Sequence, residues 1–504
     1  MKRAYLPAII LALAAFSVGS EVPGIKRLDG STITPAEIDA AVTRLMTAAA
    51  VPGVDIAILN DGKVAYMKSY GFRDKEKNLP LTPDSVMTAA SFTKSTFAYM
   101  VMQLVQEKVI DLDKPIYQYL PKPLPEYAPY RDLAGDPRYK KITARMLLSH
   151  TAGFPNLRYF TDDHKLNINF EPGSRFAYSG EGILLLQLVV ETVTGKPLEE
   201  LMQSRVFQPL GMNRTSMVWQ PRFESNYANG YDEYGRSLGP QRRPTADAAG
   251  SMQTTLKDFT RLLQAVTNGE LRHKQTRELM LSPQIQIFSK HEFPSLAKET
   301  TDENKGIRLS YGLGWGLYWS PYGKASFKEG HTDGFRNYVV CFDKLGTGMI
   351  ILTNSSNGEG IFEYLLETLL KDKYTPIEWE GYTPYDKLPP RAPLVKHREV
   401  AIDPKSLDGF FGRYQFSPQV LLRITRATGT HLFVQENDEP KQELVPEGDR
   451  KFFSTSADDE YTFEVDSSGL ATEIILRTDG KDIPIKRVPG EVRATVPLRQ
   501  PDIY

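Results

Sequence analysis

The chain has 504 residues, of which 41% are hydrophobic and 24% are charged, a length and composition typical of a globular protein with more than one domain. Its 61 Lys and Arg residues are balanced by 62 Asp and Glu residues, which excludes the strongly basic surface that nucleic-acid binding needs. We therefore expect no nucleic-acid partner and no electrostatic attraction to an anionic membrane.

The first twenty residues have the pattern of a secretory signal peptide. Lys2 and Arg3 precede an apolar run, residues 6–18, that ends at the small residues Gly19 and Ser20. The run is shorter than the roughly 20 apolar residues that cross a bilayer. We expect residues 1–20 to be a signal peptide and the mature chain to be periplasmic or secreted, with no stable membrane span.

The next part of the chain predicts a helix, a hairpin and a second helix. Residues 34–50 carry a helical repeat, and residues 54–70 form two alternating runs on either side of Asn60-Asp61-Gly62. A core-facing helix is expected to begin near Ser91, because apolar residues follow at spacings of three and four. These residues are Phe97, Met100, Val101, Leu104 and Val105.

Residues 115–175 are rich in proline and are expected to form loops that shape a cleft. Helices and strands follow them. The predicted helices are residues 183–193, which stop at a glycine cap, 255–267 and 360–371, and the clearest predicted strands are 338–342 and 349–352. This order indicates an α+β domain whose antiparallel sheet is flanked by helices and whose first and last strands meet.

A second domain is expected at the C-terminus. We interpret the proline-rich residues 373–405 as an extended linker between a first domain, residues 30–372, and a small all-β domain, residues 406–490. The alternating segments that predict its strands are residues 413–416, 421–425, 431–435, 461–465 and 472–476. Cys341, the single cysteine, lies in an apolar run and is expected to fill space in the core.

Ser91-Phe92-Thr93-Lys94 places a hydroxyl and an amine three residues apart on one face of the predicted helix start. A hydroxyl is a weak nucleophile, but a neighbouring amine can accept its proton when burial and positive charge lower the pKa of that amine. The backbone N–H of Ser91 could also stabilise an oxyanion. The alternative is a capping serine followed by a surface lysine, and the same spacing does recur in a polar loop at Ser295 and Lys298.

Further motifs follow Ser91 in the order found in one family. They are residues 147–153 (Leu-Leu-Ser-His-Thr-Ala-Gly), 172–179 (Pro-Gly-Ser-Arg-Phe-Ala-Tyr-Ser), 209–212 (Pro-Leu-Gly-Met) and His331-Thr332. Over residues 35–370 the chain resembles the serine β-lactamases and D-alanyl-D-alanine carboxypeptidases, which are penicillin-recognising serine hydrolases. The resemblance implies a β-lactamase/transpeptidase-like fold, and the C-terminal segment resembles the lipocalin-like domains of some relatives.

The same resemblance implies roles for other residues. Tyr178 takes the place of the catalytic tyrosine, which relays protons together with Lys94. His331 and Thr332 resemble the strand whose cation and hydroxyl bind a substrate carboxylate, and the backbone of Asp333 or Gly334 would supply a second oxyanion donor. His150 lies in the turn segment of the family and is expected to be structural.

Two positions depart from the family pattern. Gly180 stands where Asn is usual, so the side-chain amide that would hold the acyl-amide group of a substrate is missing. Asp333 stands where the strand normally has Gly, unless a short deletion makes Gly334 the true match, and its charge could oppose a substrate carboxylate. Both changes favour ester or small-peptide hydrolysis over efficient penicillin turnover.

Other chemistries are not indicated by the sequence. Gly235-Arg236-Ser237-Leu238-Gly239 fits the nucleophile elbow of α/β-hydrolases, but polar residues precede it and prolines follow it, so we interpret it as a turn. The sequence contains no paired cysteines, zinc-binding helix motif or phosphate-binding glycine loop, and we expect no cofactor and no metal.

The sequence therefore predicts a serine hydrolase that acts through a Ser91 acyl-enzyme on an ester, a D-amino-acid peptide or a β-lactam. The alternative is a catalytically weak sensor of the same fold that binds cell-wall peptides or penicillin. In either case the expected partner is a small molecule or a short peptide, and the oligomeric state is left open.

Overall fold

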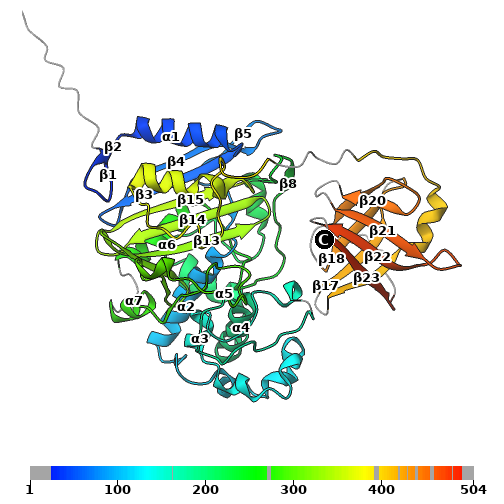
Figure 1. Ribbon diagram of the computed structural model, residues 1–504, viewed down its shortest axis with the longest axis horizontal. Helices are drawn as coiled ribbons and strands as arrows, with labels where there is room; N and C mark the ends of the chain where they lie inside the picture. The colour runs from blue at the N-terminus through cyan, green and yellow to red at the C-terminus, as the bar shows by residue number, and fades with distance from the viewer. Residues whose placement is uncertain are drawn as a thin grey trace, which may run out of the picture.

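The computed structural model describes residues 24–161, 163–268, 274–390, 397–417, 420–427, 429–437, 441–454, 459–478 and 481–490. The predicted signal peptide, residues 1–20, lies outside the described residues. Figure 1 shows a large part that contains helices and strands, with a smaller barrel of strands beside it. Within the described ranges, no helix has both the length and the apolar character that crossing a membrane requires.

The large part is built on one antiparallel sheet of nine strands. In spatial order these are β10 (Ile285–Gln286), β11 (Ser310–Tyr311), β12 (Gly316–Ser320), β13 (Gly323–Thr332), β14 (Phe335–Phe342), β15 (Thr347–Thr353), β3 (Gly53–Asn60), β4 (Lys63–Asp74) and β5 (Leu79–Pro80). β15 pairs antiparallel with β3, with Thr353 opposite Val54. The prediction that the first and last strands of the sheet meet is confirmed.

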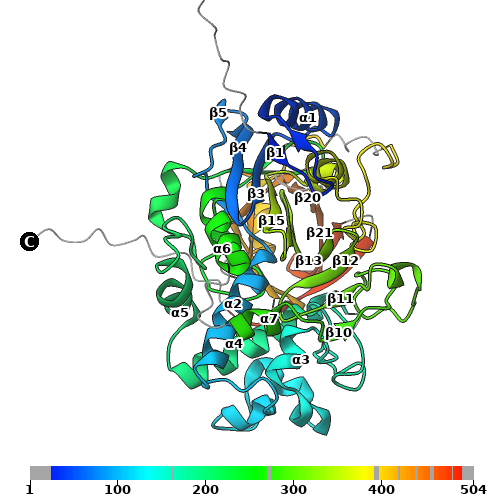
Figure 2. The ribbon, with the colours of Figure 1, turned by 90° about the vertical axis from the view of Figure 1, so that its left-hand side faces the viewer.

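Helices cover both faces of this sheet (Figures 1 and 2). The helices of the described residues are α1 (Pro35–Ala48), α2 (Phe92–Gln106), α3 (Ala144–Leu148), α4 (Gly180–Thr194), α5 (Leu198–Met202), α6 (Leu256–Asn268), α7 (Lys274–Met280) and α8 (Phe362–Leu365). Ile56 and Ile58 of β3 pack in the cluster that includes α1 and α8, whereas Ala57 and Leu59 pack in the cluster that includes α2, α4 and α6. Alternating residues of one strand therefore contribute to the two cores.

Local sequence explains where these helices begin and end. α1 begins with a capping box, in which the Thr34 side chain accepts from the Glu37 N–H and Glu37 accepts from the Thr34 N–H. α4 ends at Gly195, whose left-handed φ of 66° costs a glycine little. The predicted final helix is present as a 3-10 turn (Gly358–Ile361), α8 and a π turn (Leu366–Leu370).

Short elements connect the layers. Three two-stranded ladders pair β1 (Ile25–Lys26) with β2 (Thr32–Ile33), β6 (Met87–Thr88) with β9 (Gln253–Thr254), and β7 (Gly230–Tyr231) with β8 (Ser237–Gly239). The proline-rich residues 115–175, predicted to be loops, contain α3 and short 3-10 turns: Ile116–Tyr119, Leu124–Glu126, Ala128–Leu133, Pro137–Lys141 and Arg158–Phe160.

The predicted linker differs from the structure in its first part. Ile377, Trp379 and Tyr382 are buried in the same cluster as α1 and α8, so this segment packs on the large part of the molecule. Aromatic and aliphatic side chains between the prolines provide that packing, whereas proline spacing alone predicted an extended chain.

The C-terminal strands close into a barrel with its own core. The strands are β16 (Gly412–Ser417), β17 (Val420–Arg426), β18 (Leu432–Glu436), β19 (Gln442–Pro446), β20 (Lys451–Ser454), β21 (Glu460–Val465), β22 (Ala471–Thr478) and β23 (Lys481–Val488). β16 pairs with β23, which closes the ring, and the core includes Tyr414, Ile424, Phe452 and Phe463. The predicted all-β C-terminal domain is therefore confirmed.

Candidate active site

Ser91 precedes the first residue of α2. It acts as the N-cap, and its own side chain makes no capping hydrogen bond. The residue before it, Ala90, has a φ of 47°, a left-handed value that is unfavourable for a side chain with a Cβ. The tight turn at Ala90 leads directly into α2, so the hydroxyl and backbone N–H of Ser91 lie at the positive end of a helix.

Lys94 lies one turn into α2 and contacts the hydroxyl of Ser91. Its Nζ is 2.9 Å from Ser91 Oγ and 2.5 Å from the carbonyl oxygen of Ala249. The side chain is buried, and burial together with the charge of Lys328 lowers the pKa of Lys94 to about 7. An amine with this pKa is partly neutral at physiological pH and can accept a proton.

The phenol of Tyr178 lies between two lysines. Its hydroxyl is hydrogen-bonded to Ser91 and accepts from Lys328 Nζ at 3.0 Å, and Lys94 Nζ lies 5.0 Å from the ring centroid. Burial, followed by the charge of Glu329, nevertheless raises the pKa of Tyr178 well above its usual value. Tyr178 therefore keeps its proton, and of the two groups Lys94 is the better base.

His150 supports Tyr178 from behind. The two ring centroids are 4.4 Å apart, and Nδ1 of His150 accepts from the backbone N–H of Ser179 at 3.2 Å. Burial and the charges of Lys328 and Lys94 lower the pKa of His150 well below its usual value, so the ring is neutral. This geometry fits a structural role for His150.

The structure places the four predicted substrate-binding residues at the end of the β13–β14 hairpin. The His331 side chain is half-exposed, and its Nδ1 lies 3.3 Å from Glu359 Oε2. Thr332 Oγ1 accepts from Gln241 Nε2 at 3.2 Å, Asp333 is exposed, and the Gly334 N–H donates to Ser356 Oγ at 3.0 Å. The Gly334 N–H is thus already engaged and does not serve as an oxyanion donor in this arrangement.

Lys328, Glu329 and Gly330 precede these residues on the same strand, and contacts connect them to Tyr178 and to the turn before Ser91. Lys328 is fully buried, bonded to Tyr178 and ion-paired with Glu329. A Cβ at Gly330 would lie 2.6 Å from the Ala89 carbonyl oxygen, so only glycine lets β13 approach the start of α2 this closely. This Lys-x-Gly pattern was not predicted from the sequence, although it lies directly before His331.

Gly180 begins α4, and a neighbouring loop fills the space beside it. Asn156 Oδ1 accepts from the Gly180 N–H at 3.1 Å, and the Asn156 carbonyl accepts from Glu181 N–H at 2.9 Å. A Cβ on Gly180 would lie 3.1 Å from that carbonyl oxygen. Asn156, which is half-buried, therefore occupies the space beside Gly180 and binds the backbone at the start of α4.

The large antiparallel sheet flanked by helices, with a barrel at the C-terminus, is a serine hydrolase-type fold. The chain belongs to the β-lactamase family, which matches residues 38–370. It is 23% identical to Penicillin-binding protein 4* of Bacillus subtilis (strain 168) over 458 residues, 84% of this chain and 92% of that protein.

Two further proteins are similar to the chain. Protein flp of Staphylococcus aureus (strain NCTC 8325 / PS 47) is 22% identical over 333 residues, 63% of this chain and 62% of flp. The solved structure of the octameric penicillin-binding protein homologue from Pyrococcus abyssi matches with a TM-score of 0.56 at 22% identity. The match covers 90% of this chain and 99% of the chain from Pyrococcus abyssi, which shows a common fold.

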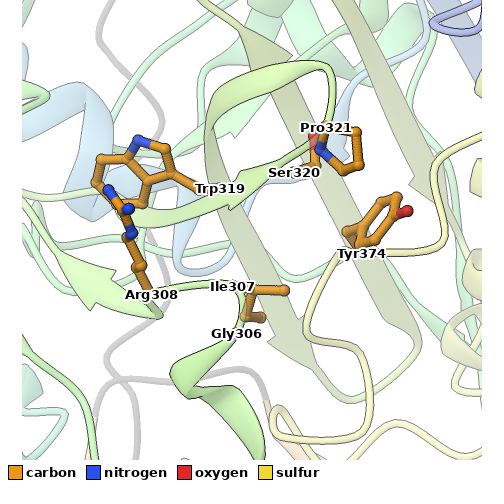
Figure 3. Close-up of a pocket in the computed structure, with 7 residues that line it drawn as sticks. All are labelled: Gly306, Ile307, Arg308, Trp319, Ser320, Pro321 and Tyr374. Atoms are coloured by element: carbon orange, nitrogen blue, oxygen red, sulfur yellow. The ribbon is translucent and has the colours of Figure 1, made fainter.

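Two other features lie away from this cluster. A cavity of about 570 Å³ is bounded by Gly306, Ile307, Arg308, Trp319, Ser320, Pro321 and Tyr374 (Figure 3). It adjoins the β12–β13 turn, at the opposite end of β13 from Gly330, and none of the residues discussed above lines it. At the barrel, the ligand atoms of His397, which precedes it, and of Glu447 and Glu460 lie within 4.8 Å of one another, but Lys451 Nζ already lies 3.1 Å from Glu447 and 2.8 Å from Glu460.

Proposed function

We propose that the protein is a hydrolase that forms an acyl-enzyme on Ser91. The observation that carries this proposal is the 2.9 Å contact between Ser91 Oγ and a buried amine, Lys94 Nζ, whose pKa is lowered to about 7. In its neutral form Lys94 accepts the hydroxyl proton as Ser91 Oγ bonds to the substrate carbonyl carbon. Water later attacks the acyl carbon, and the acyl group leaves Ser91.

Tyr178 and Lys328 serve the leaving group in this proposal. Tyr178 is protonated and hydrogen-bonded to both Ser91 and Lys328, so it can donate its proton to the departing oxygen or nitrogen. The proton taken up by Lys94 then restores the phenol. The ammonium of Lys328, 3.0 Å from the phenol oxygen, stabilises the transient negative charge on that oxygen.

Two backbone N–H groups are positioned for the oxyanion. One belongs to Ser91 at the start of α2. β12 pairs with β13 only as far as Phe327, so the edge of β13 beyond it is open. Thr332 and Phe335 pair across a two-residue turn, and the alternation of hydrogen bonds directs the His331 N–H to this open edge. We assign the second donor to His331 in place of Asp333 or Gly334.

Side chains on β13 bear on the substrate class. Glu329 follows Lys328 at the place where a hydroxyl would help bind a substrate carboxylate, and its negative charge opposes such a group. Neutral esters or small peptides are therefore better candidates than β-lactams, whose ring carries a carboxylate.

The proposal includes export of the chain and cleavage after Ser20. The N-terminal sequence of protein recovered outside the cytoplasm tests this part.

The test is covalent labelling. The purified protein is incubated with a short-chain nitrophenyl ester and, separately, with a penicillin, and intact mass spectrometry follows the adduct. We expect the ester to add its acyl group to the wild-type chain and not to Ser91→Ala. Equal labelling of both proteins contradicts the proposal, whereas labelling without product release over hours favours the penicillin-binding sensor.

A further inference from the structure

Three buried carboxyl groups interact electrostatically with Lys328 of the candidate site. Glu329 on β13, Glu292 in the segment after β10, and Glu380 after α8 are 4%, 2% and 5% exposed. Glu329 is ion-paired with Lys328, and Glu380 Oε1 accepts from the Tyr338 hydroxyl at 3.3 Å. Burying one carboxylate is costly, and burying three in one region calls for compensating positive charge or for protonation of some of them.

Two of these groups lack that compensation. Both carboxyl oxygens of Glu292 and one of Glu380 are buried without a hydrogen-bond partner among the described residues. Lys94 does not supply one, because its Nζ contacts Ser91 Oγ and the Ala249 carbonyl. Buried polar atoms in native proteins are almost always satisfied, so these oxygens indicate a missing cationic or hydrogen-donating group.

Contacts place two of these carboxyl groups near Tyr178: the ring of Phe293, the residue after Glu292, has its centroid 5.4 Å from that of Tyr178, and Glu329 pairs with Lys328, which contacts the Tyr178 hydroxyl. After burial, the charge of Glu329 raises the pKa of Glu292 and Glu380 well above the usual range, while Lys328 and Lys94 act in the opposite direction on Glu292. Burial, followed by the charges of Glu329, Glu292 and Glu380, also raises the pKa of Tyr311, whose ring centroid lies 4.9 Å from that of His150. The three glutamates do not form a group close enough to share one metal ion within the described residues.

We propose that Glu329 and Glu292 form a subsite for an ammonium group of the substrate. The proposal rests on the function proposed above and specifies its substrate class: esters or amides that carry a positive charge near the reacting carbonyl. Glu329, beside Lys328, contacts the cation, and Glu292 gives up its proton to solvent as the cation enters and supplies a second negative charge. A carboxylate in the same place would face Glu329 and be rejected.

Ethyl esters of matched length test the charge preference on the acyl side. The acyl groups are 3-aminopropionyl, butyryl and succinyl, which end in an ammonium, a methyl and a carboxylate. We expect kcat/KM to be about tenfold higher for the ammonium ester than for the butyryl ester, and lowest for the succinyl ester. A second arm compares butyrylcholine with its uncharged analogue 3,3-dimethylbutyl butyrate, which places the cation on the leaving group.

Variants connect the preference to the carboxylates. Glu329→Gln and Glu292→Gln should each reduce the ratio of ammonium to butyryl ester kcat/KM by about tenfold. The matched control is Asp55→Asn, because Asp55 on β3 is also buried with both carboxyl oxygens unpartnered, yet no lysine shifts its pKa. Its ratio should stay at the wild-type value.

Calorimetric binding to Ser91→Ala separates failure of the subsite from failure of the hydrolase. This variant should bind one of the two cationic esters, the 3-aminopropionyl ester or butyrylcholine, more tightly than it binds the succinyl ester. This result is expected whether or not the wild type is acylated. Equal affinities for the charged and uncharged esters in both arms, or ratios preserved in both glutamate variants, would overturn the subsite. Tight ammonium binding without acylation of the wild type would overturn the hydrolase and leave the subsite standing.

Discussion

Two effects lower the pKa of Lys94. Burial removes the solvation of its ammonium, and Lys328 adds like-charge repulsion, so the pKa falls to about 7. Tyr178 is buried as well, but burial raises the pKa of a phenol. In the proposed mechanism the same environment therefore suits the lysine to act as a base and the tyrosine as a proton donor.

This assignment predicts the pH dependence of ester hydrolysis. Lys94 accepts a proton only when neutral, and raising the pH through about 7 removes its proton, so kcat/KM should increase with pH and level off above 8. The rate at pH 6 should be about a tenth of that at pH 8. Steady-state kinetics with a neutral ester measures this limb, and a rate that rises only near pH 10 would contradict the assignment.

A pair of variants distinguishes the contribution of the Lys328 side chain to hydrolysis from that of the His331 side chain. Lys328→Gln removes the ammonium that contacts Tyr178 and one cause of the lowered pKa of Lys94, so kcat/KM should fall about 100-fold and the pH limb should move upward. His331→Gln removes a half-exposed ring that pairs with Glu359 and keeps the backbone N–H, so kcat/KM should change less than about twofold. The opposite ranking would restore the role first expected for His331.

The chain itself explains which of these residues could be predicted. Ser91 and Lys94 are one helical turn apart, so local spacing is enough to place them together. Lys328 and His331 differ by three positions on a strand, and which of them reaches Tyr178 depends on how far β13 runs before it turns. That register is set by Gly330 against Ala89, a contact between distant parts of the chain that periodicity cannot show.

β13 approaches α2 only because residue 330 has no side chain. A Cβ there would meet the Ala89 carbonyl oxygen at 2.6 Å and Phe92 Cδ1 at 3.2 Å, and a backbone carbonyl cannot move aside easily. Gly330→Ala should therefore lower the free energy of unfolding by about 2 kcal/mol. It should also lower kcat/KM by separating Ser91 from the edge of β13.

Thermal unfolding and ester hydrolysis measure the two effects of Gly330→Ala. Gly306→Ala is the control, because a Cβ at Gly306 meets no atom within 4 Å. It should leave both quantities near the wild-type values. Equal midpoints for Gly330→Ala and the wild type would show that β13 can move away from α2 at little cost.

Long periodic elements were predicted best. The helices of α1, α2, α4 and α6 follow the expected ranges closely, because each buries a repeating apolar face against the sheet. In the barrel, β19, β20 and β23 were not predicted. β20 is only four residues long, and β23 contains Pro484 among charged residues, so neither shows a clear alternation without its neighbours.

The barrel lies beside the loop that precedes the candidate site (Figure 1). His164 and Phe416 have ring centroids 6.4 Å apart, one from each part of the molecule. After burial, the charge of Glu436 on β18 is the largest contribution that raises the pKa of Tyr159 to about 12. Tyr159 lies three residues beyond Asn156, which contacts Gly180 at the start of α4. The barrel therefore borders the loop next to the reacting groups.

Removal of the barrel tests whether it limits access to Ser91. A chain that ends at Pro390 should remain folded, because the two cores of the large part contain no barrel residue and the barrel core contains none from the large part. The truncated chain lacks Glu436 and Phe416 beside residues 159–164, so kcat/KM for bulky aryl esters should increase several-fold. The value for ethyl butyrate should stay constant, because a small ester does not reach the loop. Hydrolysis kinetics with both esters measures this difference, and circular dichroism verifies that the truncated chain is folded. An equal change in kcat/KM for both esters in a folded truncated chain would show that the barrel does not limit substrate access.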